Sequence, residues 1–177
     1  MENLNLITIN KNMKLDSFDC GNKYINDFLK NKALHNFYIN ESSTKVLLFE
    51  EEIIGFYTTK IDNLKYNSED YYVVYLESIA VDKQYQGMRL GQLLLDNFIS
   101  KARDTVEFLG LLGISLKAVP TKRDWYEKNG FEYIEEVEEK LNLMIYDFRT
   151  EDYFEYYDSL SYWEVIIYDY IDRRSKK

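Results

Sequence analysis

The sequence predicts an α/β (α+β) protein in which helices flank a central sheet. Two observations carry this prediction. Several β-type runs lie ahead of residue 82, and beyond that point such runs alternate with helical patterns. In addition, the stretch from Leu76 to Leu95 reads as a strand that breaks into a loop bounded by glycines and then opens an amphipathic helix. Strands and helices that alternate in this way are typical of a sheet covered by helices.

The residues ahead of position 40 are predicted to form one strand and two helices. Leu6 to Ile9 is a first β-type run, and Asp19-Cys20-Gly21-Asn22 introduces a helix. A second helical stretch covers about Lys32 to Tyr38. The apolar positions predicted to face inward on the first helix are Tyr24, Ile25, Phe28 and Leu29, and those on the second are Leu34, Phe37 and Tyr38.

The middle of the chain is predicted to form an antiparallel hairpin followed by a further strand. Thr44 to Phe49 and Ile53 to Ile61 are β-rich runs joined by the charged turn Glu50-Glu51-Glu52. Asp62 to Asp70 is polar and is predicted to be a loop. Tyr71 to Val81 is then the strand that leads into the glycine-bounded loop.

The second half continues with helix, strand, helix and strand. Leu90 to about Val106 is amphipathic, since apolar residues recur every four positions. Leu111 to Val119 reads as a buried strand that Pro120 closes, and Thr121 to Asp124 has the spacing of a helix N-cap followed by an acid. The short helix that follows is predicted to end at Gly130, in the left-handed conformation, with Phe131 beginning the next strand. Leu141 to Phe148 completes the sheet.

The glycine-bounded loop has the character of a phosphate-binding site. The first backbone N–H groups of a helix have no intrahelical partner and lie at the positive end of its dipole, so they can donate to a pyrophosphate. Gly87 and Gly91 are expected to let the backbone approach closely and adopt conformations that a Cβ would penalise. The loop lacks the Lys-Ser or Lys-Thr of a P-loop and the three glycines of a dinucleotide-binding fold.

Two motifs resemble those of the GNAT superfamily of N-acetyltransferases. Gln86-Gly87-Met88-Arg89-Leu90-Gly91 resembles its acyl-CoA-binding motif, Gln/Arg-x-x-Gly-x-Gly/Ala, except that Arg89 stands at the fourth position. An arginine beside a pyrophosphate is electrostatically favourable. Trp125-Tyr126-Glu127-Lys128-Asn129-Gly130-Phe131 resembles the family's Phe-Tyr-x-x-x-Gly-Phe signature, with Trp125 at its first position. The resemblance implies the GNAT fold, a mixed and mostly antiparallel sheet of about six to seven strands flanked by helices.

The resemblance also implies an activity, the direct transfer of an acetyl group from acetyl-CoA to a primary amine in a ternary complex. Tyr126 matches the family's general acid, which protonates the departing thiolate, and Glu77 occupies a position often used to accept the amine proton, directly or through water. A backbone N–H near Ile79 to Val81 is expected to stabilise the oxyanion. The residues expected to bind acetyl-CoA are Ile79, Ala80, Val81, Gln86, Gly87, Met88, Arg89, Leu90, Gly91 and Gln92.

Composition narrows the class of protein. The chain of 177 residues is 46% apolar, has no apolar run long enough to span a membrane, and is expected to be cytoplasmic. The lone Cys20 cannot form an internal disulfide, and the lone His35 makes a Ser-His-Asp triad or a multi-histidine metal site hard to assemble. No metal is predicted. A net charge of −9 does not suggest a broad nucleic-acid surface.

The domain organisation is predicted to be one acetyltransferase domain, residues 1–148, with a helical extension, residues 149–177. The extension is tyrosine-rich and acidic. Packing on the same domain is the simplest role, and the alternatives are a homodimer contact or a lid over the substrate cleft.

The acetyl acceptor is left open between alternatives. Ser17-Phe18-Asp19-Cys20-Gly21-Asn22, with Asp27-Phe28-Leu29 and Lys32-Ala33-Leu34, resembles the amino-terminal region of the acetyltransferase toxins of toxin–antitoxin pairs, which acetylate the amine of aminoacyl-tRNA. The negative net charge instead favours a small-molecule or peptide amine, because tRNA binding depends on phosphate neutralisation. A non-catalytic CoA-binding interaction protein is a further alternative, and the presence of Tyr126 and Glu77 argues against it.

Overall fold

The computed structural model describes residues 4–149 of the chain. Within these residues seven strands form one sheet in the order β1-β2-β3-β4-β5-β7-β6. The strands are β1 Leu4–Thr8, β2 Ser43–Phe49, β3 Glu52–Tyr66, β4 Glu69–Val81, β5 Gly113–Ala118, β6 Glu132–Val137 and β7 Leu141–Asp147. Neighbouring strands are antiparallel except β4 and β5, which are parallel. The predicted mixed, mostly antiparallel sheet is confirmed. The proposed helical extension lies outside the described residues apart from Arg149.

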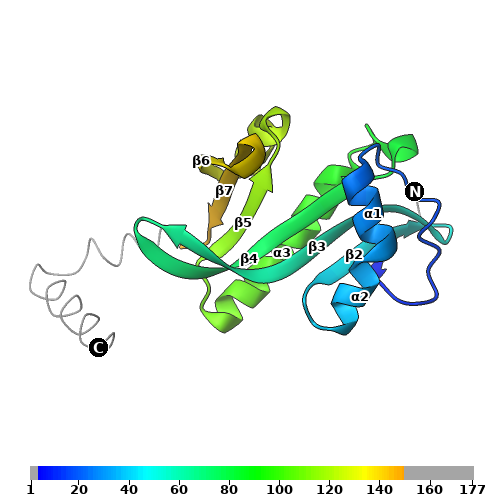
Figure 1. Ribbon diagram of the computed structural model, residues 1–177, viewed down its shortest axis with the longest axis horizontal. Helices are drawn as coiled ribbons and strands as arrows, with labels where there is room; N and C mark the ends of the chain where they lie inside the picture. Colours follow the sequence, from blue (N-terminus) through cyan, green and yellow to red (C-terminus); the bar gives the residue numbers. More distant parts are fainter. Residues whose placement is uncertain (1–3, 150–177) are drawn as a thin grey trace, which may run out of the picture.

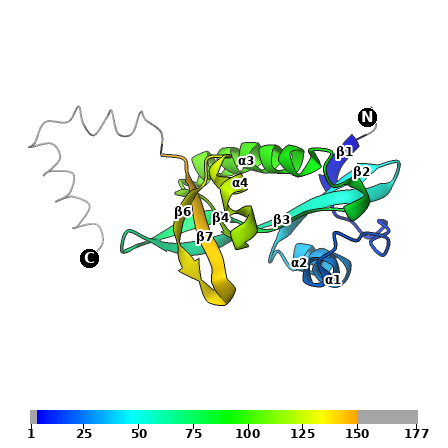
Figure 2. The ribbon, with the colours of Figure 1, turned by 90° about the horizontal axis from the view of Figure 1, so that it is seen from above.

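Helices lie on both faces of the sheet. Figure 2 shows the long α3 on one side and the paired α1 and α2 on the other. The helices are α1 Lys23–Asn31, α2 Ala33–Tyr38, α3 Leu90–Leu109 and α4 Arg123–Glu127, and the short 3-10 turns are η1 Lys83–Tyr85, η2 Pro120–Lys122 and η3 Glu138–Lys140. Each face therefore has its own apolar core.

The larger core lies between α3 and the sheet. The four-residue spacing that predicted this helix is confirmed, because Leu90, Leu94, Phe98 and Ala102 are all buried there. Burial of each such aliphatic or aromatic side chain is worth roughly 1.5–3 kcal/mol relative to exposure. This packing fixes the first turn of α3 against the end of β4.

Two positions predicted to face the smaller core under α1 and α2 are exposed instead. Leu29 is buried, and Ile25 and Phe28 are partly buried, as expected. Tyr24 is 86% exposed, so its predicted inward orientation is wrong. It lies five residues before Leu29, which places it about 140° around the helix from the buried position at 100° per residue. The last residue of α2, Tyr38, is likewise exposed.

The predicted loop at 62–70 is also wrong. β3 and β4 continue through it as one long antiparallel hairpin, which pairs Asp62 with Val73 and Tyr66 with Glu69. The turn residues Asn67 and Ser68 both have positive φ, as in the tight turns that suit the twist of a hairpin. The polar side chains in this stretch are mostly exposed, which explains why composition alone suggested a loop.

The start of α4 differs in detail from its prediction. Pro120–Lys122 forms a 3-10 turn, and the N-cap of α4 is Lys122, with no side-chain capping bond. Thr121 is therefore not the cap, although Asp124 does lie in the first turn. Gly130 has a φ of +87°, which confirms the left-handed conformation predicted after this helix.

Candidate active site

A cleft of about 990 Å³ lies where the end of β4, the following loop, the start of α3 and α4 come together. β4 and β5 pair over only three residues, Val74–Leu76 against Ile114–Leu116, although β4 runs on to Val81. Beyond the paired residues β5 turns away from β4 (Figure 1). The divergence leaves the end of β4 free to form one wall of the cleft.

Most of the predicted cofactor-binding residues line this one cleft. They are Ile79, Ala80, Val81, Gln86, Gly87, Arg89, Leu90, Gly91 and Gln92. Met88 is not among the lining residues, and its side chain is 49% exposed. Tyr126 lines the same cleft, whereas Glu77 does not.

The loop between β4 and α3 uses positive φ at two positions. Gly87 has a φ of +82°, as the sequence led us to expect of a glycine there, and Arg89 has a φ of +60°. Gly91 differs from expectation, because it lies in the first turn of α3 and its φ is not positive. A Cβ on Gly91 would meet no atom within 4 Å. Gly91 therefore leaves open space at the helix start instead of permitting an unusual backbone.

The start of α3 gives one end of the cleft several features that suit an anion. Arg89 is the N-cap and makes no side-chain capping bond, so the first N–H groups of this 20-residue helix are not capped by it. Two cationic residues, Arg89 and Lys122, also line the cleft. Uncapped amides, the helix dipole and two cations together suit a group that carries several negative charges.

Tyr126 lies on α4, and its ring contacts two aromatic neighbours. Its ring centroid is 4.8 Å from that of Trp125 and 5.5 Å from that of Phe131, both in edge-on geometry. The residue is 8% exposed, and burial raises the pKa of Tyr126 to about 12. The hydroxyl therefore keeps its proton at neutral pH, as a general acid must.

Side-chain hydrogen bonds connect α4 to the start of α3. Gln92 Nε2 donates to Asn129 Oδ1 at 2.5 Å, and Asn129 Nδ2 donates to the Trp125 carbonyl at 2.7 Å. Gln92 is thus engaged in fixing α4. This bridge connects the helix that carries Tyr126 to the start of α3.

Glu77 lies at a β-bulge in β4. Thr58 pairs with Ser78 and Thr59 with Leu76, so Glu77 is the extra residue. Its Oε1 is 3.4 Å from Lys60 Nζ, and its Oε2 is buried without a hydrogen-bond partner among the described residues. Burial, with a smaller contribution from the negative charge of Glu77, raises the pKa of Tyr75 to about 12.

Sequence reasoning missed the contribution of the amino-terminal segment to the cleft. Cys20, Asn22 and Ile25 line it, together with Tyr85, Lys122 and Trp125. Asn22 had a detectable signal, because it is an N-cap residue whose side chain accepts from the amides of Tyr24 and Ile25. Burial raises the pKa of the Cys20 thiol, which disfavours the reactive thiolate. His35 is exposed on α2.

The part of the chain that the structure describes contains neither a metal-binding cluster nor a membrane-spanning helix. Within residues 4–149, no group of three or more His, Cys, Asp or Glu side chains is placed to hold a metal ion. Over the same range, no helix has the length and apolar character needed to cross a membrane.

The chain is similar in sequence to one family model and in fold to several toxins. A model described as an acetyltransferase (GNAT) domain matches residues 35–133, more than half of the chain. No curated protein is significantly similar in sequence. A bacterial toxin superposes with a TM-score of 0.77 at 18% identity, over 92% of this chain and 99% of the toxin.

Two structures of the toxin AtaT are also similar. AtaT complexed with acetyl-methionyl-tRNAfMet gives a TM-score of 0.73 at 19% identity, over 82% of this chain and 95% of that one. A tyrosine-to-phenylalanine mutant of AtaT, bound to acetyl-CoA and the C-terminus of the antitoxin AtaR, gives 0.71 at 20% identity, over 81% and 92%. At these identities the likeness shows a common fold.

Proposed function

The chain belongs to the acetyltransferase (GNAT) domain family, and from this premise we propose that it transfers an acetyl group from acetyl-CoA to a primary amine of a small molecule or a peptide. One observation carries the proposal. A single cleft joins the uncapped, cation-flanked start of α3 to Tyr126, a buried tyrosine that retains its proton. An acyl-CoA needs both features, because it carries phosphates at one end and releases a thiolate at the other.

The residues fit the cofactor in distinct ways. Acetyl-CoA supplies the acetyl thioester. Gly87, Arg89 and the amides that begin α3 are assigned to its pyrophosphate, and Lys122 adds a second positive charge at the cleft. Ile79 to Val81, at the free end of β4, provide backbone groups for its amide-bearing arm and a donor for the oxyanion.

Tyr126 is assigned proton delivery to the departing thiolate. Its pKa of about 12 means that it stays protonated throughout the physiological range, so the proton is available at the moment the C–S bond breaks. The aromatic contacts of its ring fix the direction of the hydroxyl. Tyr126→Phe keeps those ring contacts, and we expect turnover to fall about 10- to 1,000-fold with little change in acetyl-CoA affinity.

Glu77 is assigned the acceptance of the amine proton through water. An ammonium has no lone pair, so the acceptor must lose a proton before it attacks. Glu77 does not line the cleft, which argues for a relay over direct contact. Its buried, unpartnered Oε2 is available to accept a hydrogen bond from such a water, while Lys60 holds the other oxygen.

Charge supports an amine acceptor of low negative charge. A net charge of −9 attracts cationic amines and repels polyanions at long range. A second candidate, acetylation of aminoacyl-tRNA, is supported by the similar toxin structures, one of which contains acetyl-methionyl-tRNAfMet. The two candidates share the reaction and the cofactor and differ only in the acceptor.

Free-thiol release from acetyl-CoA, measured across panels of amines, peptides and charged tRNAs, tests the proposal. We expect release with at least one amine or peptide and a loss of that release in Tyr126→Phe. Efficient acetylation of charged tRNA alone, with affinity falling steeply as salt is added, would instead establish the second candidate. Arrest of protein synthesis by the intact chain, but not by Tyr126→Phe, would support the same conclusion. Release that is unaffected in Tyr126→Phe, with chemistry rate-limiting, would remove Tyr126 from the mechanism.

A further inference from the structure

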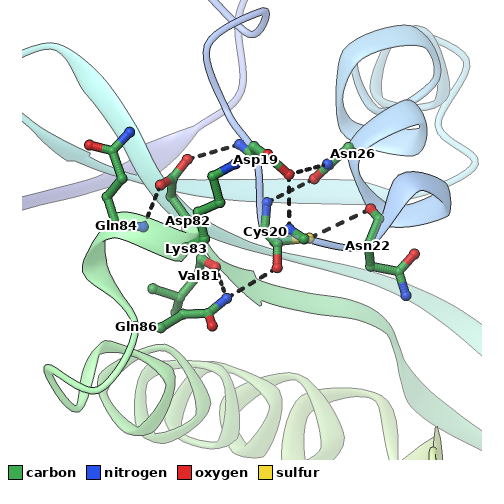
Figure 3. A network of polar contacts seen from close by, with 10 residues as sticks. Asp19, Cys20, Asn22, Asn26, Val81, Asp82, Lys83, Gln84 and Gln86 are labelled. Carbon is green, nitrogen blue, oxygen red and sulfur yellow. Dashed lines mark hydrogen bonds and ion pairs between the residues drawn. The ribbon is translucent and has the colours of Figure 1, made fainter.

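We propose that Asp82 and Asp19 are positioning residues that fix the α1 wall of the cleft to the cofactor loop, so that acetyl-CoA bound at the loop sets the place of that wall. The α1 wall is the set Cys20, Asn22 and Ile25, and the cofactor loop is residues 82–89. The inference rests on the proposed function in one respect, the binding of acetyl-CoA at this loop. The two segments are distant in sequence and meet through the polar network of Figure 3.

Asp82 is the buried carboxylate at the loop end of the network. It is only 5% exposed, and each of its carboxylate oxygens accepts a different backbone N–H. Oδ1 accepts from Gln84 at 2.9 Å, within the loop, and Oδ2 accepts from Asp19 at 2.8 Å, in the amino-terminal segment. One buried side chain therefore shapes the start of the loop and attaches the other segment to it.

Lys83 and Gln86 of the loop donate further hydrogen bonds to the amino-terminal segment. Lys83 donates its backbone N–H to the Asp19 carbonyl at 2.8 Å and its ammonium to Asp19 Oδ2 at 2.5 Å. Gln86 Nε2 donates to the Cys20 carbonyl at 3.1 Å and to the Val81 carbonyl at 3.0 Å. The Lys83 ammonium, followed by hydrogen bonds from Gly21 and Asn26, holds the pKa of Asp19 well below its usual range.

The network continues into the first turn of α1. Asp19 Oδ1 accepts from Asn26 Nδ2 at 2.7 Å, and Asn26 Oδ1 accepts from the Cys20 amide at 2.9 Å. Asn22 caps the helix. An unbroken chain of hydrogen bonds thus runs from Asp82 to the helix that carries Asn22 and Ile25.

Residues of the cofactor loop and of the α1 wall both line the same cleft. The cofactor loop carries Arg89 and leads into the α3 amides, which suit phosphate. The α1 wall of Cys20, Asn22 and Ile25 carries no charged side chain. The α1 wall therefore suits the acceptor better than the cofactor. Correct relative placement matters for rate, because a misplacement of about 1 Å can cost about 100-fold in a reaction between two bound groups.

Asp82→Asn is the sharpest perturbation. Both oxygens of Asp82 face N–H donors, so the amide of an asparagine presents an NH₂ group to one of them and must lose that hydrogen bond. The side-chain volume hardly changes. Lys83→Met, which removes only the exposed ammonium of the network, is the milder variant. Asp104→Asn is the matched control, because Asp104 forms an exposed ion pair with Lys101 on α3.

Hydrogen exchange at saturating acetyl-CoA tests the positioning role without knowledge of the acceptor. In the wild-type chain we expect acetyl-CoA to slow exchange both in residues 83–92 and in residues 19–26. In Asp82→Asn we expect slowing in 83–92 to persist and slowing in 19–26 to be lost, with a partial loss in Lys83→Met. Asp104→Asn should behave as the wild type does.

Steady-state kinetics with any acceptor identified provide the second readout. We expect kcat/KM for the acceptor to fall about 10- to 100-fold in Asp82→Asn, by a larger factor than any rise in the KM for acetyl-CoA. A merely structural role would lower the melting temperature and leave the slowing in 19–26 intact in the folded fraction, which would overturn the inference. Slowing confined to 83–92 in the wild type would also overturn it. Calorimetry separates the remaining outcome: if the folded wild type binds no acetyl-CoA, both the proposed function and this inference fail.

Discussion

Replacement of Arg89 should separate the backbone role of this residue from its role as a cation. Arg89 has a φ of +60°, in the left-handed region, which costs an ordinary L-residue roughly 1–2 kcal/mol and costs glycine little. The family pattern that the loop resembles has glycine at this position. Arg89 therefore adopts an unfavourable conformation at a position that lines the cleft.

We expect Arg89→Gly and Arg89→Ala to weaken acetyl-CoA binding equally and to differ in stability. Both remove the guanidinium, and because Arg89 is exposed we take the lower end of the range for a charge-assisted hydrogen bond, about 1.5 kcal/mol or roughly tenfold in Kd. Only Arg89→Ala keeps the left-handed cost. Arg89→Gly should therefore be about 1 kcal/mol more stable than Arg89→Ala.

Calorimetry with acetyl-CoA and urea unfolding measure the two effects independently. Two glycine-to-alanine changes provide reference values for the conformational cost of a positive φ. Gly87→Ala, at a φ of +82° with open space around it, should be destabilised by about the same conformational cost, whereas Gly91→Ala, in the first turn of α3, should not be. Equal stability of the two Arg89 variants would refute the backbone argument, and an unchanged Kd in both would refute the role of the cation.

Three other changes test separate parts of the site. Gly91→Asp should weaken acetyl-CoA binding, measured by calorimetry, because it places a negative charge where we assign the pyrophosphate. Unchanged affinity would show that the pyrophosphate does not bind at Gly91. Glu77→Gln should impair the rate most near neutral pH and less at high pH, where more of the amine is already neutral, and a uniform loss across the pH profile would contradict the base role. Asp19→Asn should lower the free energy of unfolding by an amount that is constant above about pH 5 and shrinks as the pH falls below about 4. The reason is that the pKa of Asp19 is lower in the folded than in the unfolded chain. The ionised carboxylate therefore stabilises the fold above the unfolded pKa, and this contribution is lost as the pH falls toward the folded pKa. A difference between wild type and Asp19→Asn that grows on acidification would show that Asp19 is not held ionised by Lys83 and its other partners.

Elements with a strong local pattern were predictable from sequence. α3 repeats apolar residues every four positions, and each of Leu90, Leu94, Phe98 and Ala102 is buried as that period requires. The left-handed Gly130 after α4 follows from the preference of glycine for helix ends. In both cases the local preference of the chain and its tertiary packing agree.

Elements that depend on partners elsewhere were not predictable. The polar ends of β3 and β4 read as a loop, yet pairing along the full hairpin and burial of Leu64 and Val73 against Leu112 keep them in the sheet. The attachment of Asp19 to Asp82 joins residues 63 positions apart, and no local signal encodes such a contact. The α1 wall of the cleft was missed for the same reason, although the motif residues on the other wall were found.

Three local irregularities lie in the segment that leads from β4 into α3. Between residues 77 and 89 the chain contains the bulge at Glu77 and two left-handed residues, Gly87 and Arg89. Before the bulge Val74 and Leu76 face the α3 core, whereas after it Ile79 and Val81 do, so the bulge reverses the alternation of side chains. Ile79 and Val81 therefore face α3 at the end of β4 that lines the cleft. Arg89, a non-glycine residue with an unfavourable positive φ, lines this cleft, and such strain supports a functional role for the loop.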